Sequence, residues 1–506
     1  MISTPSPLPA AANTVDRFSR EDWQRGYQTQ PQETSYWVED IQGEIPASLR
    51  GTLFRNGPGT LDVGGQRFHH PFDGDGMICA FTFIDGKVFF RNRYVRTPGF
   101  IAEQAAGKIL YRGVFGTQRP GGPLANAFDL KLKNIANTGV HYWGERLLAL
   151  WEAAEPFRLD PVSLDTLGPD HLDGLLSEGQ PFSAHPRIDP GSPRTGGQRR
   201  FVNFGVKAGL SSAIALYEFH EDGSLAQEQT RTVPGFAFLH DFVLTENYYC
   251  FFQNPVKFNP LPFVFGLKGA GQCLAFDPKG KTQMLLIPRD PAQPMQTLET
   301  DSCFVFHHGN AFERVSDQGR PQLVVDSICY PSFPSVEPGA DFMETNFEEV
   351  PPGQLFRFTA ELEGGSVSRE ALSLRPCEFP SLHPAKVGQA ARYYYIGVTD
   401  SPAANAPLQA ILKQDLETGA TQTWSAAPRG FISEPLFVPA PNSKADGEAE
   451  DEGWVLCLIY NAARHGSDLV ILQAQSLTEV ARIRLQQHIP YGLHGSFTAA
   501  TFGVGD

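Results

Sequence analysis

The chain has 506 residues and is 41% hydrophobic and 19% charged, an ordinary balance for a globular protein with enough apolar material for a large core. Its formal net charge of −15 argues against a polyanion such as nucleic acid as the main partner, but it does not exclude a neutral, apolar ligand. These totals allow several average domains or one large all-β architecture.

The N-terminal segment, residues 1–15, is rich in Pro, Ser and Ala, which predicts disorder. It has no basic region followed by an apolar stretch, and we find no apolar run long enough to span a bilayer. We therefore expect a soluble, cytoplasmic protein in which residues 16–506 form one domain. The seven cysteines lack a C-x-x-C pair and lie mostly in apolar runs, which indicates buried free thiols in a reducing compartment.

From residue 16 onward the recurring pattern is a strand, a tight turn and a second strand. Asp85-Gly86 lies between two β-rich runs, which is a strong signal for a hairpin. Similar units recur over residues 214–230, 355–372, 410–424 and 469–485. Short antiparallel sheets repeated over so long a chain predict a β-propeller, with a pair of large sandwiches as the alternative.

Two segments have the composition of linkers, residues 187–200 and 440–453. Each falls between adjacent predicted strands, so we interpret both as exposed loops rather than as domain boundaries. Helical content is expected to be low and confined to residues 46–51 and 102–113. One domain is therefore the preferred reading of the whole chain.

Four histidines have comparable sequence surroundings, because each follows small or apolar residues and adjoins a predicted strand. They are His185, His240, His307 and His494. In a propeller the inner strand of each blade contributes about one residue to the axis, and converging imidazoles would favour Zn, Cu, Fe or Ni over Mg or Ca. No local pair of ligands is present, so spacing alone leaves ordinary core histidines equally open.

Several motifs spread over nearly the whole chain resemble those of the carotenoid cleavage oxygenase family. They include "GTLFRNGPG", "HPFDGDGM", "SAHPRIDP", "FVFHHGNAFE" and "IPYGLHGSF". The likeness is densest to cyanobacterial members that cleave apocarotenoids. It implies a seven-bladed β-propeller that holds one Fe(II) on four histidines, beneath a dome of loops and helices that contains an apolar tunnel.

The resemblance assigns the iron ligands to His185, His240, His307 and His494. Successive side chains of a strand point to opposite faces, so only one of His307 and His308 can face the axis, and the family motif selects His307. The resemblance also implies three carboxylates that bind the other ring nitrogen of a ligand, namely Glu152, Glu378 and Glu434. Each is a lone acid among apolar residues, and the alternative is an exposed side chain at a strand end.

The family pattern further implies that Thr138 shades an open coordination position and that aromatic residues line the tunnel. Those aromatic residues are Trp151, Phe238, Phe306, Tyr330, Phe115 and Tyr27, and ordinary core packing is the alternative for each of them. Within the apolar segment 261–267, we expect Leu261, Phe263, Val264 and Phe265 to form an exposed patch at a membrane interface. The alternative for this segment is a buried strand.

The function implied is that of an Fe(II)-dependent oxygenase that adds O₂ across one C=C bond of a linear apocarotenoid and releases two carbonyl products. The central cut that yields retinal is the expected one. No dinucleotide or flavin fingerprint is present, so we expect no organic cofactor. The alternatives are a relative that cleaves stilbenoids or another bond, an isomerase, and a non-catalytic carotenoid-binding metalloprotein. We expect a monomer that makes peripheral contact with membranes.

Overall fold

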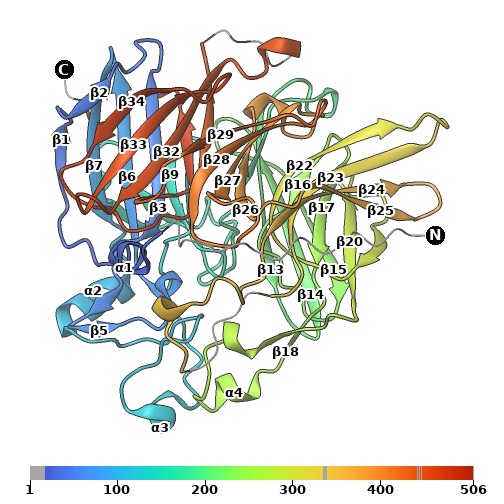
Figure 1. Ribbon diagram of the computed structural model, residues 1–506. Helices are drawn as coiled ribbons and strands as arrows, with labels where there is room; N and C mark the ends of the chain where they lie inside the picture. Colours follow the sequence, from blue (N-terminus) through green and yellow to red (C-terminus); the bar gives the residue numbers. More distant parts are fainter. Residues whose placement is uncertain (1–17, 334–338, 442, 444, 446, 505–506) are drawn as a thin grey trace.

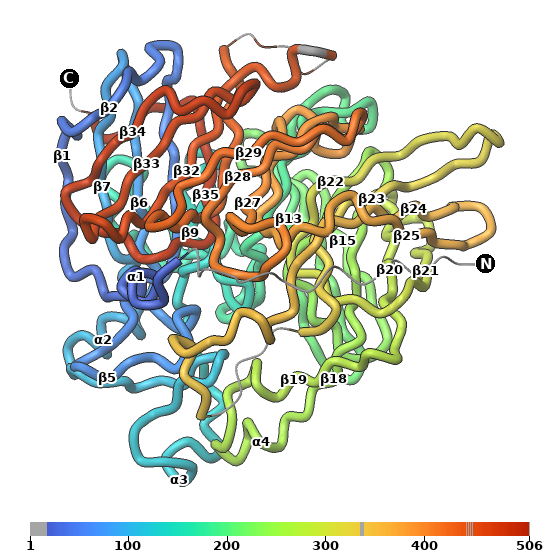
Figure 2. Tube along the Cα trace, in the orientation of Figure 1, coloured from blue at the N-terminus to red at the C-terminus, as the bar shows by residue number. Residues whose placement is uncertain are grey.

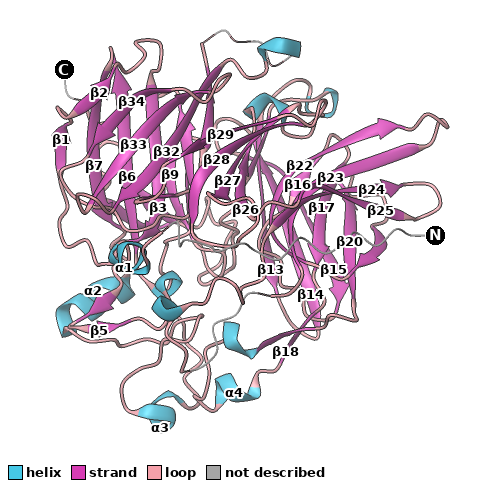
Figure 3. Cartoon of the chain, in the orientation of Figure 1, coloured by secondary structure: helices cyan, strands magenta, loops and turns pink. Residues whose placement is uncertain are grey.

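Seven β-sheets make up most of this protein, and they are arranged as the blades of a propeller around one axis. The structure is a computed structural model that describes residues 18–333, 339–441, 443, 445 and 447–504. Figures 1 and 3 show the blades side by side, with a few short helices at their ends. The predicted all-β, seven-bladed propeller is confirmed, and the segment 1–15 lies outside the described residues.

The blades follow one another along the chain. The first contains β1 (Ser35–Trp37), β3 (Gly51–Pro58), β6 (Gly76–Ile84), β7 (Lys87–Tyr94) and β35 (Gly495–Thr498). The second contains β8 (Gly139–Trp143), β9 (Arg146–Leu150), β10 (Phe157–Leu159) and β11 (Thr166–Pro169). The third contains β12 (Arg187–Asp189), β13 (Arg200–Lys207), β14 (Ser211–Phe219) and β15 (Leu225–Pro234).

The remaining blades have the same antiparallel order. The fourth contains β16 (Val243–Leu244), β17 (Tyr248–Gln253), β20 (Lys281–Pro288) and β21 (Gln296–Asp301), and the fifth contains β22 (Phe304–Val315), β23 (Pro321–Tyr330), β24 (Gln354–Glu361) and β25 (Val367–Ser373). The sixth contains β26 (Cys377–Ser381), β27 (Tyr393–Thr399), β28 (Leu408–Asp415) and β29 (Thr421–Ser425). The seventh contains β2 (Ile41–Gly43), β30 (Gly430–Ile432), β31 (Leu436–Pro439), β32 (Gly453–Asn461), β33 (Gly466–Gln473) and β34 (Glu479–Arg484).

Strands from the two ends of the chain close the ring of blades. Strand β35 pairs antiparallel with β3, so that Phe497 lies opposite Leu53, and β2 pairs with β34, so that Ile41 lies opposite Ile483. Figure 2 shows the result, with blue N-terminal strands beside red C-terminal strands. Because β35 begins directly after His494, this closure also fixes one of the four histidines to the first blade.

Turn chemistry explains where the hairpins form. Between β6 and β7, Asp85 and Gly86 have φ values of 50° and 71°, and a two-residue turn of this kind needs a positive φ at both positions. Glycine adopts such values freely, and aspartate tolerates them better than most residues. The other four predicted hairpins form as β14–β15, β24–β25, β28–β29 and β33–β34.

Short helices and two small ribbons gather at one end of the axis, at the bottom of Figure 1, and we call this region the dome. It contains α2 (Pro98–Ala106), α3 (Gly122–Asn126), α4 (Leu261–Val264), and the ribbons β4 (Asp62–Val63) with β5 (Gln66–Arg67) and β18 (Val256–Phe258) with β19 (Leu274–Phe276). Helix α1 (Arg20–Arg25) lies beside it. No helix in the described ranges is long and apolar enough to cross a membrane.

The two helical predictions had mixed outcomes. Residues 46–51 form a turn and the start of β3 instead of a helix. The segment 102–113 is helical only as far as Ala106, because Gly107, with a φ of 59°, ends α2 in the left-handed conformation. Short 3₁₀ turns complete the structure at Pro71–Asp73, Pro193–Thr195, Gly271–Cys273, Phe342–Glu344, Pro384–Lys386 and Gly447–Ala449.

Apolar side chains fill the space between neighbouring blades. Between the first and seventh blades, for example, Phe81 and Phe90 pack with Leu469 and Ile483, and all four are fully buried. Burying one such side chain stabilises the fold by roughly 1.5–3 kcal/mol. All seven cysteines are free and buried, as the sequence predicted.

Candidate metal centre

Four histidines meet on the propeller axis, each brought there by the inner strand of a different blade. His185 and His240 lie just before β12 and β16, His307 lies within β22, and His494 lies just before β35. One ring nitrogen from each lies within 4.8 Å of the corresponding atoms of the others. The structure thus brings together the four histidines that were predicted as ligands.

Three glutamates stand behind this cluster, each beside the Nδ1 atom of one histidine. The distances are 2.5 Å from His240 to Glu152, 2.6 Å from His307 to Glu378, and 2.9 Å from His494 to Glu434. An ionised carboxylate can only accept, so each Nδ1 carries a proton toward its glutamate. In the neutral ring Nε2 then presents a lone pair toward the axis, which is the tautomer that a metal ligand needs.

Glu434 is part of a buried charge network. Its Oε2 atom accepts hydrogen bonds from Arg55, at 2.6 Å, and from the backbone of Gly495, at 3.0 Å. Burial would raise the pKa of Glu434, but the interactions with His494 and Arg55 outweigh it and lower this pKa to about 2. The carboxylate is therefore ionised at neutral pH. Sequence reasoning missed Arg55, although it lies within the "GTLFRNGPG" motif.

Glu378 is held by three donors. Besides His307, it accepts from the hydroxyl of Tyr330 at 2.5 Å and from the backbone of Phe379 at 2.7 Å. Burial would raise the pKa of Glu378, and the interaction with His307 together with these hydrogen bonds lowers it below the ordinary value. Tyr330 was predicted as a tunnel residue, and its contact with this carboxylate was not foreseen.

His185 differs from the other three histidines, because within the described ranges no carboxylate bonds to its ring. Burial and then the neighbouring imidazoles lower the pKa of His185 well below its ordinary value, so the ring is neutral at physiological pH. Its Nε2 atom lies 2.9 Å from the Nε2 atom of His240. A neutral imidazole in this position can act as a ligand without losing a proton.

The donor set fits a transition metal ion. The Nε2 atom of His307 is buried and has no hydrogen-bond partner among the described residues, which leaves it available on the axis. Four imidazole nitrogens facing one another suit Zn, Cu, Fe or Ni and are unlike the oxygen ligands of Mg or Ca. The cluster could therefore hold one such ion.

His308 points away from this cluster although it follows His307 directly. Its Nδ1 atom lies 2.7 Å from the hydroxyl of Ser327, and its ring packs at 5.0 Å from that of Phe252. Burial lowers the pKa of His308 to about 4, so it is a neutral core residue at physiological pH. The structure places only His307 of this pair on the axis.

Thr138 lies beside the cluster through its backbone, since its carbonyl accepts from the N–H of His494 at 3.1 Å. Its hydroxyl donates to the side-chain oxygen of Asn137 at 2.9 Å. Trp151, the neighbour of Glu152, is buried against Ile135 and Ala154. Thr138 thus contacts the predicted ligand His494, and Trp151 precedes the predicted carboxylate Glu152 in the sequence.

The other predicted tunnel residues fall into two aromatic groups. Phe306 lies 5.6 Å from the ring of His240 and packs with Tyr330 and Phe333, and Phe238 contacts the same Phe333. The second group lies beneath the dome, and it comprises Tyr27, Phe342, His70, Phe72 and Phe115, with ring centroids 4.6–5.6 Å apart along this series. The first group touches the metal centre directly.

The predicted membrane segment is helix α4 and the turn after it, not a strand. Leu261 and Phe265 are exposed, Val264 is half-buried, and Phe263 is buried beneath them with the guanidinium of Arg112 at 4.0 Å from its ring. Assigning Phe263 to an exposed patch was therefore wrong. The helix turns this side chain inward because it contacts an arginine from a distant part of the sequence.

Comparison with known proteins places the chain among relatives. The family model described as retinal pigment epithelial membrane protein, RPE65, matches residues 27–499. Apocarotenoid-15,15′-oxygenase from Synechocystis sp. is 51% identical over 500 residues, which is 98% of this chain and 99% of the relative. Lignostilbene-alpha,beta-dioxygenase isozyme III from Sphingomonas paucimobilis is 31% identical, over 91% of this chain and 94% of the relative.

The crystal structure of the cobalt-substituted Synechocystis apocarotenoid oxygenase is similar in fold, with a TM-score of 0.92 at 52% identity, and the match covers 95% of this chain and 99% of that one. Both the family model and the full-length relatives span the blades that supply the four histidines and the three glutamates. The chain therefore belongs to the RPE65 family of carotenoid oxygenases.

Proposed function

We propose that this protein is an Fe(II)-dependent oxygenase that cleaves one C=C bond of a linear apocarotenoid with O₂. The observation that carries this proposal is the four-histidine cluster with its three glutamates, in a chain 51% identical over nearly its full length to an apocarotenoid-15,15′-oxygenase. The proposed cut is at the central double bond and yields retinal. One C=C bond and one O₂ molecule account for both carbonyl groups, so the reaction needs no external reductant.

Iron is the proposed metal at the cluster formed by His185, His240, His307 and His494. When bound there, Fe(II) would activate O₂ for reaction with the C=C bond. Four neutral ligands leave the charge of a divalent ion uncompensated, and Glu152, Glu378 and Glu434 return negative charge one contact further out. The cobalt-substituted relative supports a site that accepts divalent transition metals.

The protein itself positions and shields the reacting groups. Glu152, Glu378 and Glu434 keep the ligand rings in one tautomer and one orientation. Because the hydroxyl of Thr138 is engaged by Asn137, its methyl group is the part free to shade an open position beside the metal. Phe306 next to His240 makes this side apolar, which excludes water from the site and favours a hydrocarbon substrate.

The two aromatic groups suit a long polyene. In this proposal Phe238, Phe306 and Tyr330 contact the substrate near the bond that breaks, and Tyr27 and Phe115 contact it nearer its end beneath the dome. Aromatic faces pack well against a conjugated chain that offers only π-electrons and methyl groups. Holding one double bond at a fixed position beside the metal is a proximity effect, and such effects lower barriers substantially.

Peripheral contact with membranes is proposed for the outer surface of the dome. Six exposed apolar side chains lie there on two neighbouring segments, and we call them the dome patch: Leu124, Phe128, Leu130, Leu261, Phe265 and Leu267. The segments touch, since the backbone N–H of Phe128 donates to the carbonyl of Val264 at 2.7 Å. Such a grouping of exposed apolar residues is typical of an interface with lipid or protein.

The proposed activity can be tested by purifying the protein without oxygen, adding Fe(II), and then supplying air and apocarotenals of graded length. Chromatography should show two carbonyl products for each substrate that is cleaved, one of them retinal, and none with His307→Ala. A stilbenoid belongs in the same screen because of the lignostilbene relative. Cleavage of stilbenoids alone would show that the substrates are stilbenoids and not apocarotenoids. If the iron-loaded protein cleaves none of these compounds, the proposal is refuted.

A further inference from the structure

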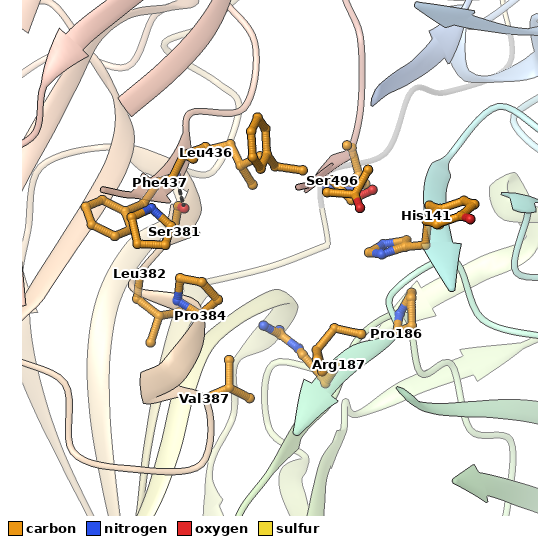
Figure 4. Close-up of a pocket in the computed structure, with 18 of the residues that line it drawn as sticks. His141, Pro186, Arg187, Ser381, Leu382, Pro384, Val387, Leu436, Phe437 and Ser496 are labelled. Carbon is orange, nitrogen blue, oxygen red and sulfur yellow. Dashed lines mark hydrogen bonds between the residues drawn. The ribbon is translucent and has the colours of Figure 1, made fainter. Parts of the chain in front are cut away.

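A cavity of about 880 Å³ lies on the propeller axis at the end away from the dome, and we call it the axial vestibule. Loops and hairpin turns between the strands form its wall, including Trp143–Glu145, Pro384, Val387 and the residues 439–441. Figure 4 shows His141, Arg187 and Val387 around this space. It is separate from the aromatic groups beneath the dome.

The axial vestibule connects the metal centre with solvent. Its inner end is lined by His185, His307 and His494 and by the carboxylate of Glu434. Its outer end is lined by Arg50, Arg199 and Glu221, whose side chains are 54%, 54% and 60% exposed. A small hydrated species can therefore approach three of the four histidines from this side.

The charges along this path do not oppose a cation. Arg187 points into the vestibule, but Asp241 lies 2.6 Å from its guanidinium and compensates its charge. Arg199 at the mouth is paired with Glu221 at 3.4 Å. Over the whole wall the four acidic side chains, Glu145, Glu221, Asp241 and Glu434, outnumber the three arginines, Arg50, Arg187 and Arg199. At the inner end, Glu434 is paired with Arg55 and Asp241 with Arg187, so this end carries no excess positive charge.

The dome side offers a less suitable path to an ion. Phe306 lies against His240, and Phe304 and Phe333 pack against Phe306 at 4.6 Å and 6.1 Å. A hydrated dication that passes aromatic rings loses water without gaining ligands, and that transfer has a high cost. The wall of the vestibule is mainly apolar but carries charged side chains, and its volume of about 880 Å³ lets the same ion keep part of its hydration shell.

One further imidazole lies between the mouth and the metal centre. The side chain of His141, from β8, points into the vestibule. It is packed edge-on at 6.1 Å from Phe201. A neutral imidazole that faces a water-filled passage is a suitable transient ligand for a divalent transition metal.

We propose that the metal ion enters and leaves the four-histidine centre through the axial vestibule, and that His141 is the first imidazole that binds it on the way. This inference rests on the proposed metal site. It separates two routes in one molecule: the ion arrives through the vestibule, and the hydrocarbon arrives by the dome. Metal exchange is then independent of whether the dome is occupied.

The route can be tested by closing it reversibly. Because all native cysteines are buried, Val387→Cys introduces one accessible thiol in the wall of the vestibule, which a bulky methanethiosulfonate can cap as a disulfide. Leu267→Cys in the dome patch is the matched control. The measurements are the rate of Co(II) uptake by metal-free protein, followed by visible absorbance, and the rate of Co(II) loss to a chelator.

Capping at position 387 should slow both rates by about tenfold or more, which corresponds to a rise of about 1.4 kcal/mol in the barrier. The final cobalt content should be unchanged, and removal of the cap by a reductant followed by desalting should restore the rates. Capping at position 267 should change neither rate. Equal rates in both capped proteins, or a slower rate only at position 267, would overturn the route.

The part assigned to His141 has its own test. His141→Ala should lower the rate of uptake several-fold at low Co(II) concentration while the final occupancy stays at one ion per chain. Uptake at the wild-type rate would remove His141 from the route, and the result at position 387 would still decide the route itself. If the uncapped wild-type protein binds no cobalt at all, the metal site is refuted, and the route with it.

Discussion

The two ends of the propeller axis surround the same four histidines with opposite chemistry. On the dome side, Phe306 and its aromatic neighbours lie against His240, and the outer surface carries the apolar dome patch. On the other side, the wall of the axial vestibule includes the charged side chains of Arg187, Asp241 and Glu434. The metal centre therefore lies between an aromatic compartment and a cavity whose wall carries charged side chains.

This difference matters because the proposed reaction needs both an apolar substrate and a metal ion, and these two require different surroundings. A polyene partitions into apolar surroundings, whereas a divalent ion and its carboxylate partners need polar ones. Placing the ligands on the inner strands of four blades lets each end of the axis be specialised independently. Substitutions at the metal centre and on the dome side should therefore have separable effects on metal binding and on membrane binding.

The largest effect is expected from removing one ligand. His307→Ala should abolish stoichiometric metal binding, whereas His308→Ala should leave it at one ion per chain, because only the first ring reaches the axis. Loss of His308 should instead lower the free energy of unfolding by about 2–4 kcal/mol, through a buried cavity and the loss of the bond to Ser327. Metal analysis and denaturant unfolding of the two variants check both expectations.

A result in which both variants hold equal amounts of metal would show that the assignment within the pair is wrong. Wild-type stability of His308→Ala would show instead that the site around Ser327 relaxes without cost. Neither outcome would affect the other, since the two rings point to opposite faces of β22.

Removing the charge of a glutamate should have the next largest effect. Replacement of Glu152, Glu378 or Glu434 by Gln keeps the shape but weakens the orientation of the ligand ring, and such changes typically cost roughly ten- to a hundred-fold in metal affinity or activity. Glu434→Gln should also destabilise the protein by about 3 kcal/mol or more, because Arg55 is buried and would lose its counter-charge.

Glu152 provides the internal control, because within the described residues His240 is the one side chain bonded to its carboxylate. Glu152→Gln should therefore weaken metal binding without a comparable loss of stability. Titration with Fe(II) under anaerobic conditions and thermal unfolding separate the two quantities. Unchanged metal affinity in all three variants would show that these carboxylates do not act on the ligands.

The metal centre could be predicted further from the sequence than its surroundings. The histidines and glutamates lie in motifs that resemble those of the family, and this resemblance identified them, whereas Asp85-Gly86 defines its hairpin locally. The burial of Phe263 could not be foreseen, because Arg112 covers its ring from a segment far away in the sequence. The dome patch likewise joins α3 and α4, which only the fold brings together.

On the apolar side, the dome patch should govern binding to lipid vesicles. The double variant Leu261→Asp, Phe265→Asp should lower partitioning into neutral vesicles by about tenfold or more, since burying one such side chain contributes roughly 1.5–3 kcal/mol. The control is Leu225→Asp, Val315→Asp, which adds the same charge at exposed apolar residues of two hairpins. Cleavage of detergent-solubilised substrate should persist in both.

Vesicle flotation at low and high salt distinguishes the possible outcomes. Binding driven by apolar contact should depend weakly on salt, because the net charge of −15 gives no attraction to anionic lipid. Equal flotation of the dome-patch variant and its control would show that the patch does not dock on membranes.

The smallest effect is expected from Tyr330→Phe, a change at the contact between the aromatic side and the carboxylates. The hydroxyl of Tyr330 donates to Glu378 at 2.5 Å, and its removal leaves that carboxylate with the bonds from His307 and Phe379. A hydrogen bond to a charged group contributes about 1.5–3 kcal/mol, but the ring and its contact with Phe306 remain. Metal affinity should therefore fall only several-fold, less than for Glu378→Gln. If Tyr330 acts through Glu378, the double variant Tyr330→Phe, Glu378→Gln should bind metal no more weakly than Glu378→Gln alone, and additive losses would show that the tyrosine acts on the substrate side instead.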